Sequence, residues 1–208
     1  MIIALDEEKL VAACRELAAR DEDLAFIFHN FGKPPLWARE PGFASLVHII
    51  LEQQVSVASA KSAFGKLVKY IEILTPESFL KLNDAELKEI GFSRQKIGYA
   101  RGLTQAILEG KIDLKTLESL PDADIKAELK KLKGIGDWTV DIYLLMALLR
   151  PDVMPKGDLA LHIAWQKLKN LELRPSSDEF LSTAQKWKPL RAVAARLLWH
   201  FYLNSKKL

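Results

Sequence analysis

The chain lacks the features that would place it in a membrane or in a disulfide-linked fold. Cys14 is the only cysteine among 208 residues, which excludes an internal disulfide and a zinc or iron–sulfur site ligated by cysteines. No apolar run reaches the roughly 18 residues that a membrane span requires. The N-terminus, MIIALDEEKL, becomes acidic too early for a signal peptide. We therefore expect no membrane association and a location in the cytoplasm, or in the nucleus of a eukaryote.

Metal ligands, excess charge of one sign and a nucleotide-binding loop are lacking as well. The four histidines are not at metal-ligand spacing, so no metal site is expected; they are His29, His48, His162 and His200. Lys and Arg total 30 against 27 acids, a net charge of +3, so any nucleic-acid contact would need a local basic face. No Gly-x-x-x-x-Gly-Lys-Ser/Thr loop is present, which makes a nucleoside triphosphate an unfavourable ligand.

The sequence also lacks period-2 alternation and Asn-Gly turns, which makes a β-sheet unfavourable. Helical spacing of apolar residues runs through most of the chain instead, and residues 192–203 are apolar nearly all round, as in the central helix of a bundle. We expect a single all-α domain, residues 1–208, built as a two-lobed helical bundle. The middle lobe would span about 43–130, and residues 1–42 and 131–208 would form the other lobe.

Helix starts are marked by residues that cap free backbone N–H groups. Thr75 precedes a proline, Asn83 lies three residues before Glu86, and Ser176 lies three residues before Glu179. Each arrangement predicts the N-terminus of a helix.

The most distinctive stretch begins with the hairpin sequence Leu132-Lys133-Gly134-Ile135-Gly136 and ends at Asp158. An apolar helix is expected from Trp138 to Leu149, followed by a loop that contains Pro151 and Pro155. The two hairpin glycines permit a positive φ and let backbone N–H groups approach an anion closely. A phosphate group fits this arrangement.

These residues resemble the helix-hairpin-helix DNA glycosylases, whose Gly/Pro-rich loop ends in an aspartate. Within that superfamily the chain is similar to 3-methyladenine DNA glycosylase II, the alkylation-repair branch. Further matching segments lie before and after this stretch, and all matches occur in the family's order; the segments are Leu51-Glu52-Gln53-Gln54-Val55-Ser56-Val57, Gly91-Phe92-Ser93 with Lys96, and Trp187-Lys188-Pro189-Leu190-Arg191. Together the matches cover about residues 41–203.

The resemblance implies an enzyme that flips an alkylated purine out of double-stranded DNA and hydrolyses its N-glycosidic bond. No redox cofactor is implied, and we expect a monomer that associates with the nucleoid in a prokaryote. Larger members carry an additional N-terminal β-rich domain. Only about forty residues precede the match here, so we expect that domain to be absent. The residues do not rank 3-methyladenine, 7-methylguanine, hypoxanthine and ethenoadenine as substrates.

Two interpretations of Asp158 are open. It could serve only as the N-cap of the following helix, a frequent role for Asp. The resemblance implies that it is also the catalytic carboxylate. Such a group offsets the positive charge that develops at C1′ of the sugar and orients the attacking water.

Trp138 and Trp199 could likewise be ordinary core residues. They fall where the family places its aromatic base pocket, and an electron-rich ring attracts a base that alkylation has made cationic. The family has a further pocket tyrosine four residues after Trp138, where this chain has Ile142. That departure leaves the breadth of substrates open.

The remaining candidates are DNA contacts implied by the resemblance. Gln53 or Gln54 would reach towards the gap left by the flipped base, although either could simply satisfy a buried helix end. Phe92 and Arg94 are the two candidates for the intercalating wedge. The hairpin residues would hold a phosphate; they are Lys133, Gly134, Ile135 and Gly136, and a monovalent cation could bind their carbonyls.

Two other functions remain as alternatives. A non-catalytic DNA-binding module would use the hairpin to grip phosphates but would not need Asp158. A bifunctional glycosylase/lyase needs an amine for a Schiff base, and the lyase relatives place that lysine where this chain has Trp138. We therefore expect a monofunctional enzyme.

Overall fold

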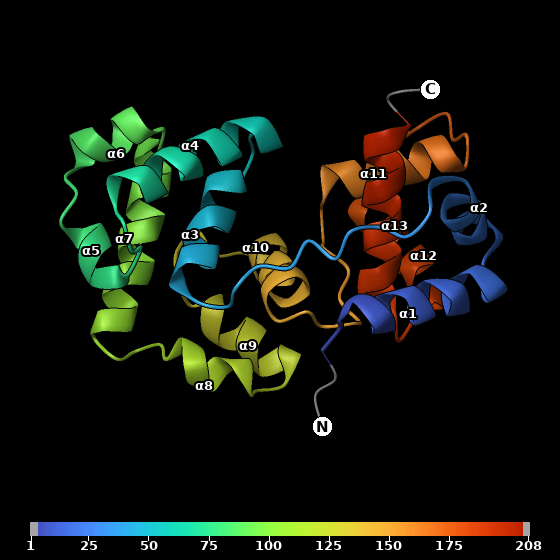
Figure 1. The fold of residues 1–208 in the computed structure, drawn as a ribbon, viewed down its shortest axis with the longest axis horizontal. Coiled ribbons are helices and arrows are strands. Elements are labelled where there is room, and N and C mark those ends of the chain that lie inside the picture. Colours follow the sequence, from blue (N-terminus) through green and yellow to red (C-terminus); the bar gives the residue numbers. More distant parts are fainter. Residues whose placement is uncertain (1–3, 206–208) are drawn as a thin grey trace. The chain divides into compact units, whose positions relative to one another are not determined.

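The structure is a computed structural model that describes residues 4–205. Within that range the chain forms helices and loops, with no residue in a β-strand, so the expected all-α class is confirmed (Figure 1). The α-helices are α1 Glu7–Arg20, α2 Glu22–Phe31, α3 Phe43–Glu52, α4 Val57–Tyr70, α5 Pro76–Leu80, α6 Asp84–Ile90, α7 Arg94–Leu108, α8 Leu114–Glu118, α9 Asp122–Leu129, α10 Asp137–Ile142, α11 Leu159–Leu168, α12 Ser177–Ala184 and α13 Arg191–Asn204. A π-helical turn, η1 Tyr143–Ala147, and a 3-10 turn, η2 Gln185–Trp187, complete the order.

Local signals account for several helix boundaries. The side chains of Thr75, Asn83 and Ser176 each accept a hydrogen bond from the backbone N–H of the third residue of their helix, and the side chain of that third residue accepts one from the backbone N–H of the cap residue. These three capping boxes confirm the predicted starts of α5, α6 and α12. None of the helices in residues 4–205 is long and apolar enough to cross a membrane. No group of three or more His, Cys, Asp or Glu side chains in that range could hold a metal ion.

The chain divides into two compact units. Unit 2 spans residues 39–143, and unit 1 combines residues 1–38 with residues 144–208. The structure differs from the predicted lobe boundary, which ended the middle lobe near residue 130. The hairpin and α10 belong to unit 2, in which Lys126 of α9 forms an ion pair with the buried Asp141 of α10 at 2.5 Å.

Unit 1 is organised around α13, which contacts α1, α2 and α11 (Figure 1, red helix). Every residue from Ala192 to Trp199 is buried, as its almost uniformly apolar sequence predicts. The exception in chemistry is Arg196, whose guanidinium lies wholly inside this unit.

In unit 2, α3 contacts α4, α7 and α10. An aromatic cluster lies within this unit: the ring of Phe79 is 5.9 Å from the ring of Phe43 and 6.0 Å from that of Phe92. All three side chains are almost fully buried. This cluster joins the start of α3 to α5 and to the segment that precedes α7.

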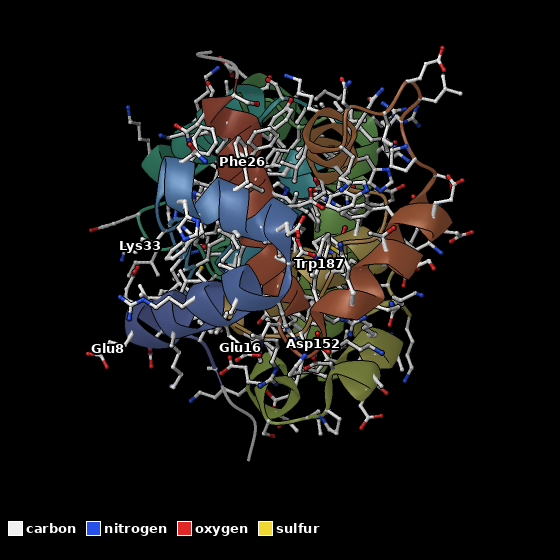
Figure 2. All side chains as sticks on the ribbon, turned by 90° about the vertical axis from the view of Figure 1, so that its right-hand side faces the viewer. Glu8, Glu16, Phe26, Lys33, Asp152 and Trp187 are labelled. Carbon is white, nitrogen blue, oxygen red and sulfur yellow. The ribbon has the colours of Figure 1, made fainter. Side chains whose placement is uncertain are left out.

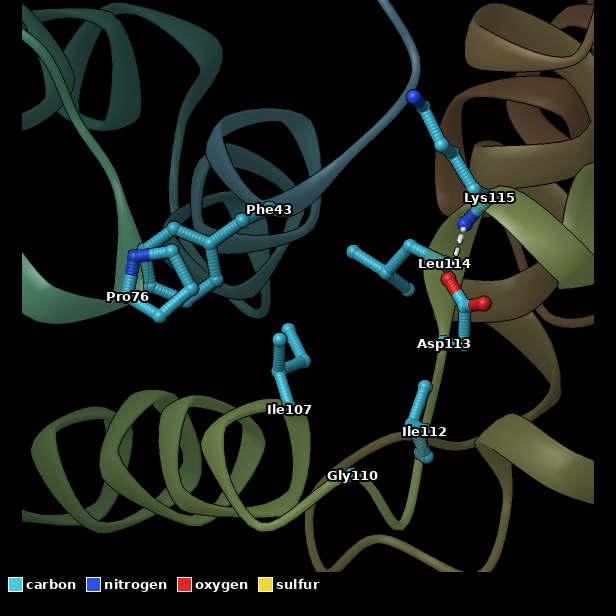
Figure 3. A pocket seen from close by; sticks show the side chains of 8 residues that line it. All are labelled: Phe43, Pro76, Ile107, Gly110, Ile112, Asp113, Leu114 and Lys115. Carbon is cyan, nitrogen blue, oxygen red and sulfur yellow. Dashed lines mark hydrogen bonds between the residues drawn. The ribbon is translucent and has the colours of Figure 1, made fainter.

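Unit 2 also contains a pocket of about 480 Å³. Its lining is largely apolar and consists of Phe43, Pro76, Ile107, Gly110, Ile112, Asp113, Leu114 and Lys115. Figure 3 shows Phe43, Pro76 and Ile107 on one side and the segment from Ile112 to Lys115 on the other. The pocket includes none of the residues that the sequence motifs single out.

Candidate functional site

The hairpin lies between α9 and α10 in unit 2. Its turn is closed by a hydrogen bond from the Ile135 amide to the Leu132 carbonyl at 3.1 Å. Gly134 has φ +87, and a Cβ added there would lie 2.1 Å from the ring of Tyr99. Gly136 has φ −101, and a Cβ there would have no neighbour within 4 Å. Of the two glycines that permit a positive φ, only Gly134 therefore uses it.

The lysines before the hairpin differ in how much of their charge is already paired. Lys130 and Lys131 form ion pairs with Asp137 and Glu128 at 2.5 and 2.7 Å. Lys133 is exposed and forms no ion pair with another residue between 4 and 205. Of these side chains, Lys133 has the charge that remains available to an external anion.

Gln53, at the end of α3, supports the hairpin from within the protein. Its Nε2 donates to the Gly134 carbonyl at 2.8 Å and to the Thr139 hydroxyl at 2.9 Å. Gln54 is exposed and has φ +55, which is unusual for a residue other than glycine. Of the two glutamines expected to reach DNA, Gln53 is engaged with the hairpin in this structure, whereas Gln54 faces solvent.

Lys96 also contacts the C-terminal end of α3 in unit 2. Its Nζ donates to the Leu51 carbonyl, the last turn of α3, at 2.6 Å. Burial lowers the pKa of the Lys96 ammonium. Lys96 is thus bound to the protein at the base of the segment that carries Gln54.

Phe92, one of the two wedge candidates, is not exposed in this structure. Its side chain is only 3% exposed and packs against Phe79 in the aromatic cluster. Inserting it between bases would require removing it from that cluster. Arg94, the first residue of α7, is exposed and remains the candidate on this loop.

Asp158 is buried at the start of α11 in unit 1. Its Oδ1 accepts from the Leu161 amide at 3.0 Å and from the indole Nε1 of Trp199 at 3.0 Å. The first contact is an N-cap; the second joins the two residues that the motif analysis assigns to catalysis and to the base pocket. Burial lowers the pKa of His162, one turn further along α11, although the nearby Asp158 carboxylate raises it.

An ion pair secures the loop that carries Asp158. The Arg191 side chain donates from Nε and Nη2 to the two carboxylate oxygens of Asp152 at 2.8 and 3.0 Å. The Arg191 amide also donates to Asp152, and the Ala192 amide donates to the Pro151 carbonyl. Figure 2 labels Asp152 within unit 1. The loop is therefore attached to the first turn of α13.

Trp199 meets a second tryptophan that the motifs did not single out. The Trp37 ring lies 6.1 Å from the Trp199 ring at an interplanar angle of 78°, an edge-to-face contact. Trp37 has φ +49, a conformation that costs on the order of 1–3 kcal/mol for a bulky residue. The only sequence signal was a tryptophan within the loop that contains Gly32, Pro34 and Pro35.

Arg196 holds the chain next to Trp37. Its Nε donates to the Leu36 carbonyl at 3.0 Å, and its Nη1 and Nη2 donate to the carbonyls of Ala192 and Leu145. Burial lowers the pKa of Arg196 to about 10, so it stays charged at neutral pH. A hydrogen bond from a charged donor contributes about 1.5–3 kcal/mol, a size comparable to the strain at Trp37.

The candidate residues therefore form two groups. Unit 1 brings together Asp158, Trp199 and Trp37. Unit 2 holds the hairpin with Gln53, and also Gln54, Arg94 and the half-buried Trp138 in the first turn of α10.

Comparison with known proteins gives the family of the chain. Residues 47–190 match the family model of the HhH-GPD superfamily base excision DNA repair proteins. The DNA-3-methyladenine glycosylase 1 of Schizosaccharomyces pombe is 29% identical over 165 residues, which is 77% of this chain and 72% of that protein. YfjP of Bacillus subtilis is 29% identical over 184 residues. That alignment covers 85% of this chain but spans 64% of the length of YfjP.

Solved structures give the same result. The S. pombe 3-methyladenine DNA glycosylase Mag1 in complex with abasic DNA superposes with a TM-score of 0.86 at 26% identity, covering 95% of this chain and 97% of that one. A DNA-3-methyladenine glycosidase from Bacillus halodurans superposes with a TM-score of 0.78 at 25% identity, covering 100% and 94%.

Proposed function

This chain belongs to the HhH-GPD superfamily of base excision DNA repair proteins, and we propose that it is a monofunctional glycosylase that removes alkylated purines from duplex DNA. The observation that carries the proposal is the hydrogen bond from Trp199 to the buried Asp158. It places an acid, held by two N–H donors, beside an aromatic ring. The names of the S. pombe and B. halodurans relatives support the substrate class.

In the proposed reaction Asp158 acts as a carboxylate. As the bond from C1′ to the base nitrogen breaks, positive charge develops on the sugar, and the negative charge of Asp158 stabilises it. The same carboxylate orients a water molecule towards C1′. The N–H groups of Leu161 and Trp199 fix the position of Oδ1, so little reorganisation is needed during the reaction.

Trp199 of unit 1 and Trp138 of unit 2 are the two aromatic residues proposed to recognise a flipped base, each through the chemistry of its own ring face. Alkylation at a ring nitrogen of a purine gives 3-methyladenine and 7-methylguanine lesions a positive charge, which an indole face attracts. Extrusion of the base loses its stacking energy in the duplex, and stacking on an aromatic ring of the protein returns part of that energy.

DNA binding would rest mainly on unit 2. The exposed Lys133 and the hairpin amides would contact phosphate, with a monovalent cation on the hairpin carbonyls as a further element of this proposal. Gln54 and Arg94 would contact the duplex around the extruded nucleotide. Gln53 would act indirectly, because its amide holds the hairpin.

We propose that the enzyme leaves the DNA strand intact. A lyase step needs an amine that attacks C1′ to form a Schiff base. The position that lyase relatives use for this lysine is Trp138 here. Borohydride should accordingly trap no covalent complex with DNA.

The direct test is release of free bases. The full chain is incubated with duplex DNA treated with a methylating agent, and the released bases are separated by chromatography. We expect 3-methyladenine and 7-methylguanine in the soluble fraction and an unbroken DNA strand. DNA binding without base release would favour the alternative, a non-catalytic DNA-binding module.

A further inference from the structure

Trp37 is the residue near the proposed active site whose conformation the proposed chemistry does not explain. Its backbone is in the left-handed region, at φ +49, which bulky side chains rarely adopt. Its ring is half-buried and meets the ring of Trp199 edge to face. A strained residue beside a functional group is a reason to look for a role of the strain itself.

Two contacts restrain the Trp199 ring from different directions. The indole Nε1 is held by Oδ1 of Asp158 at 3.0 Å. A single hydrogen bond at one edge still allows the ring to tilt about that edge. The contact with Trp37, at an interplanar angle of 78°, opposes that tilt.

The backbone before Trp37 is itself held from within unit 1. The buried Arg196 donates to the carbonyl of Leu36, the residue before Trp37. Arg196 and Trp199 are three residues apart on α13, so both lie on nearly the same face of that helix. Helix α13 thus carries both Trp199 and Arg196, and Arg196 holds the backbone next to Trp37, whose ring contacts Trp199.

We propose that Trp37 is a positioning residue that determines specificity: it fixes the plane of Trp199 and thereby favours excision of neutral damaged bases. This inference rests on the proposed function. A cationic base is attracted to an indole face electrostatically, and that attraction tolerates modest tilting. A neutral base such as hypoxanthine depends on close ring contact and on accurate placement beside Asp158. Loosening Trp199 should therefore slow excision of neutral bases more than excision of cationic ones.

The positive φ of Trp37 makes it possible to remove the ring without adding backbone strain. Asn adopts a positive φ more readily than Trp, so Trp37→Asn relieves strain while it removes the ring. Trp37→Phe keeps an aromatic edge in the same place. Trp165→Phe is the matched control, because Trp165 also belongs to unit 1 but packs against Phe180 and Trp187.

Single-turnover excision is measured for the full-length variants on two duplexes, one with hypoxanthine and one with 7-methylguanine, and melting temperatures are recorded. We expect Trp37→Asn to slow hypoxanthine excision by about 5- to 10-fold and 7-methylguanine excision by less than about 2-fold. In Trp37→Phe the ratio of the hypoxanthine rate to the 7-methylguanine rate should return close to the wild-type value. In Trp165→Phe that ratio should equal the wild-type value.

The outcomes separate this inference from the function on which it rests. Equal slowing of both lesions by Trp37→Asn, or no slowing of either, overturns the role of Trp37 while wild-type excision upholds the proposed function. Excision of neither lesion by the wild-type chain overturns the proposed function and this inference with it. A shift of the ratio that Trp37→Phe reverses supports both.

Discussion

The two units place their candidate residues in opposite environments. In unit 1, Asp158 and Trp199 are each 8% exposed and are bonded to each other. In unit 2, Gln54, Arg94 and Lys133 are exposed side chains. A carboxylate that stabilises a cationic transition state gains strength from exclusion of water. Groups that grip a DNA backbone must instead be accessible and act through charge and reach. In the proposed function, unit 1 therefore supplies the catalytic carboxylate and unit 2 supplies most of the DNA contacts.

Phe92 offers the largest effect, because it was expected among the exposed contacts and is buried instead. Phe92→Ala should lower the free energy of unfolding by about 3–5 kcal/mol, since it opens a cavity in the cluster with Phe79. Arg94→Ala, two residues along, should change it by less than about 0.5 kcal/mol. Denaturant unfolding of both variants makes the measurement. Unchanged stability of Phe92→Ala together with weaker DNA binding would return Phe92 to the wedge role.

The hairpin glycines test whether unit 2 grips DNA through its backbone. Gly134→Ala should destabilise the protein by at least about 2 kcal/mol, because of its positive φ and the overlap with Tyr99, and should weaken DNA binding. Gly136→Ala has open space and an ordinary φ, so its stability should stay within about 0.5 kcal/mol. Thermal unfolding and a titration with a duplex containing an abasic-site analogue measure both. Full DNA affinity in a folded Gly134→Ala variant would argue against the hairpin as the grip.

The Arg191–Asp152 pair tests whether the loop of unit 1 serves catalysis. Arg191→Lys removes the two-pronged contact and should slow excision by about 10-fold, since small displacements of a reacting group are costly. DNA affinity should be unchanged. Arg101→Lys is the control, because Arg101 pairs with Asp84 in unit 2, also through Nε and Nη2. Equal slowing by both variants would show a general effect of losing an ion pair.

The smallest effects separate the two glutamines. Gln54→Ala should weaken DNA binding by about 3- to 10-fold with little change in melting temperature, as expected for one exposed contact. Gln53→Ala should lower the free energy of unfolding by about 1–2 kcal/mol, because it removes the hydrogen bonds to Gly134 and Thr139. The reverse pattern in the same two assays would restore Gln53 as the residue that reaches DNA.

The features that the sequence predicted well are those with local causes. Helix periodicity and the caps at Thr75, Asn83 and Ser176 depend on residues within one turn, so the all-α class and several helix starts were predictable. The hairpin was also predictable, because its two glycines, Gly134 and Gly136, lie two residues apart in the chain.

What the sequence could not show depends on partners far along the chain. Phe92 is buried against Phe79. Gln53 turns inward to bond Gly134 and Thr139, which lie more than eighty residues further along the chain. The contact of Trp37 with Trp199 joins the first and last parts of the chain. No periodicity or cap rule reports contacts of that kind.

Asp158 provides the most direct test of the account. Asp158→Asn keeps the size of the side chain and can still cap α11, so the fold should be preserved. Its loss of negative charge should slow excision of hypoxanthine by at least about 100-fold and that of 7-methylguanine by less, because a cationic purine is already a good leaving group. Asp178→Asn, which changes an exposed acid of the same unit, is the matched control.

The decisive measurement is single-turnover excision by wild type, Asp158→Asn and Asp178→Asn on the same two duplexes, with a binding titration beside it. The account predicts that only Asp158→Asn loses excision and that it binds DNA at least as tightly as wild type. Near-wild-type excision of both lesions by Asp158→Asn would contradict the assignment of the chemistry to unit 1.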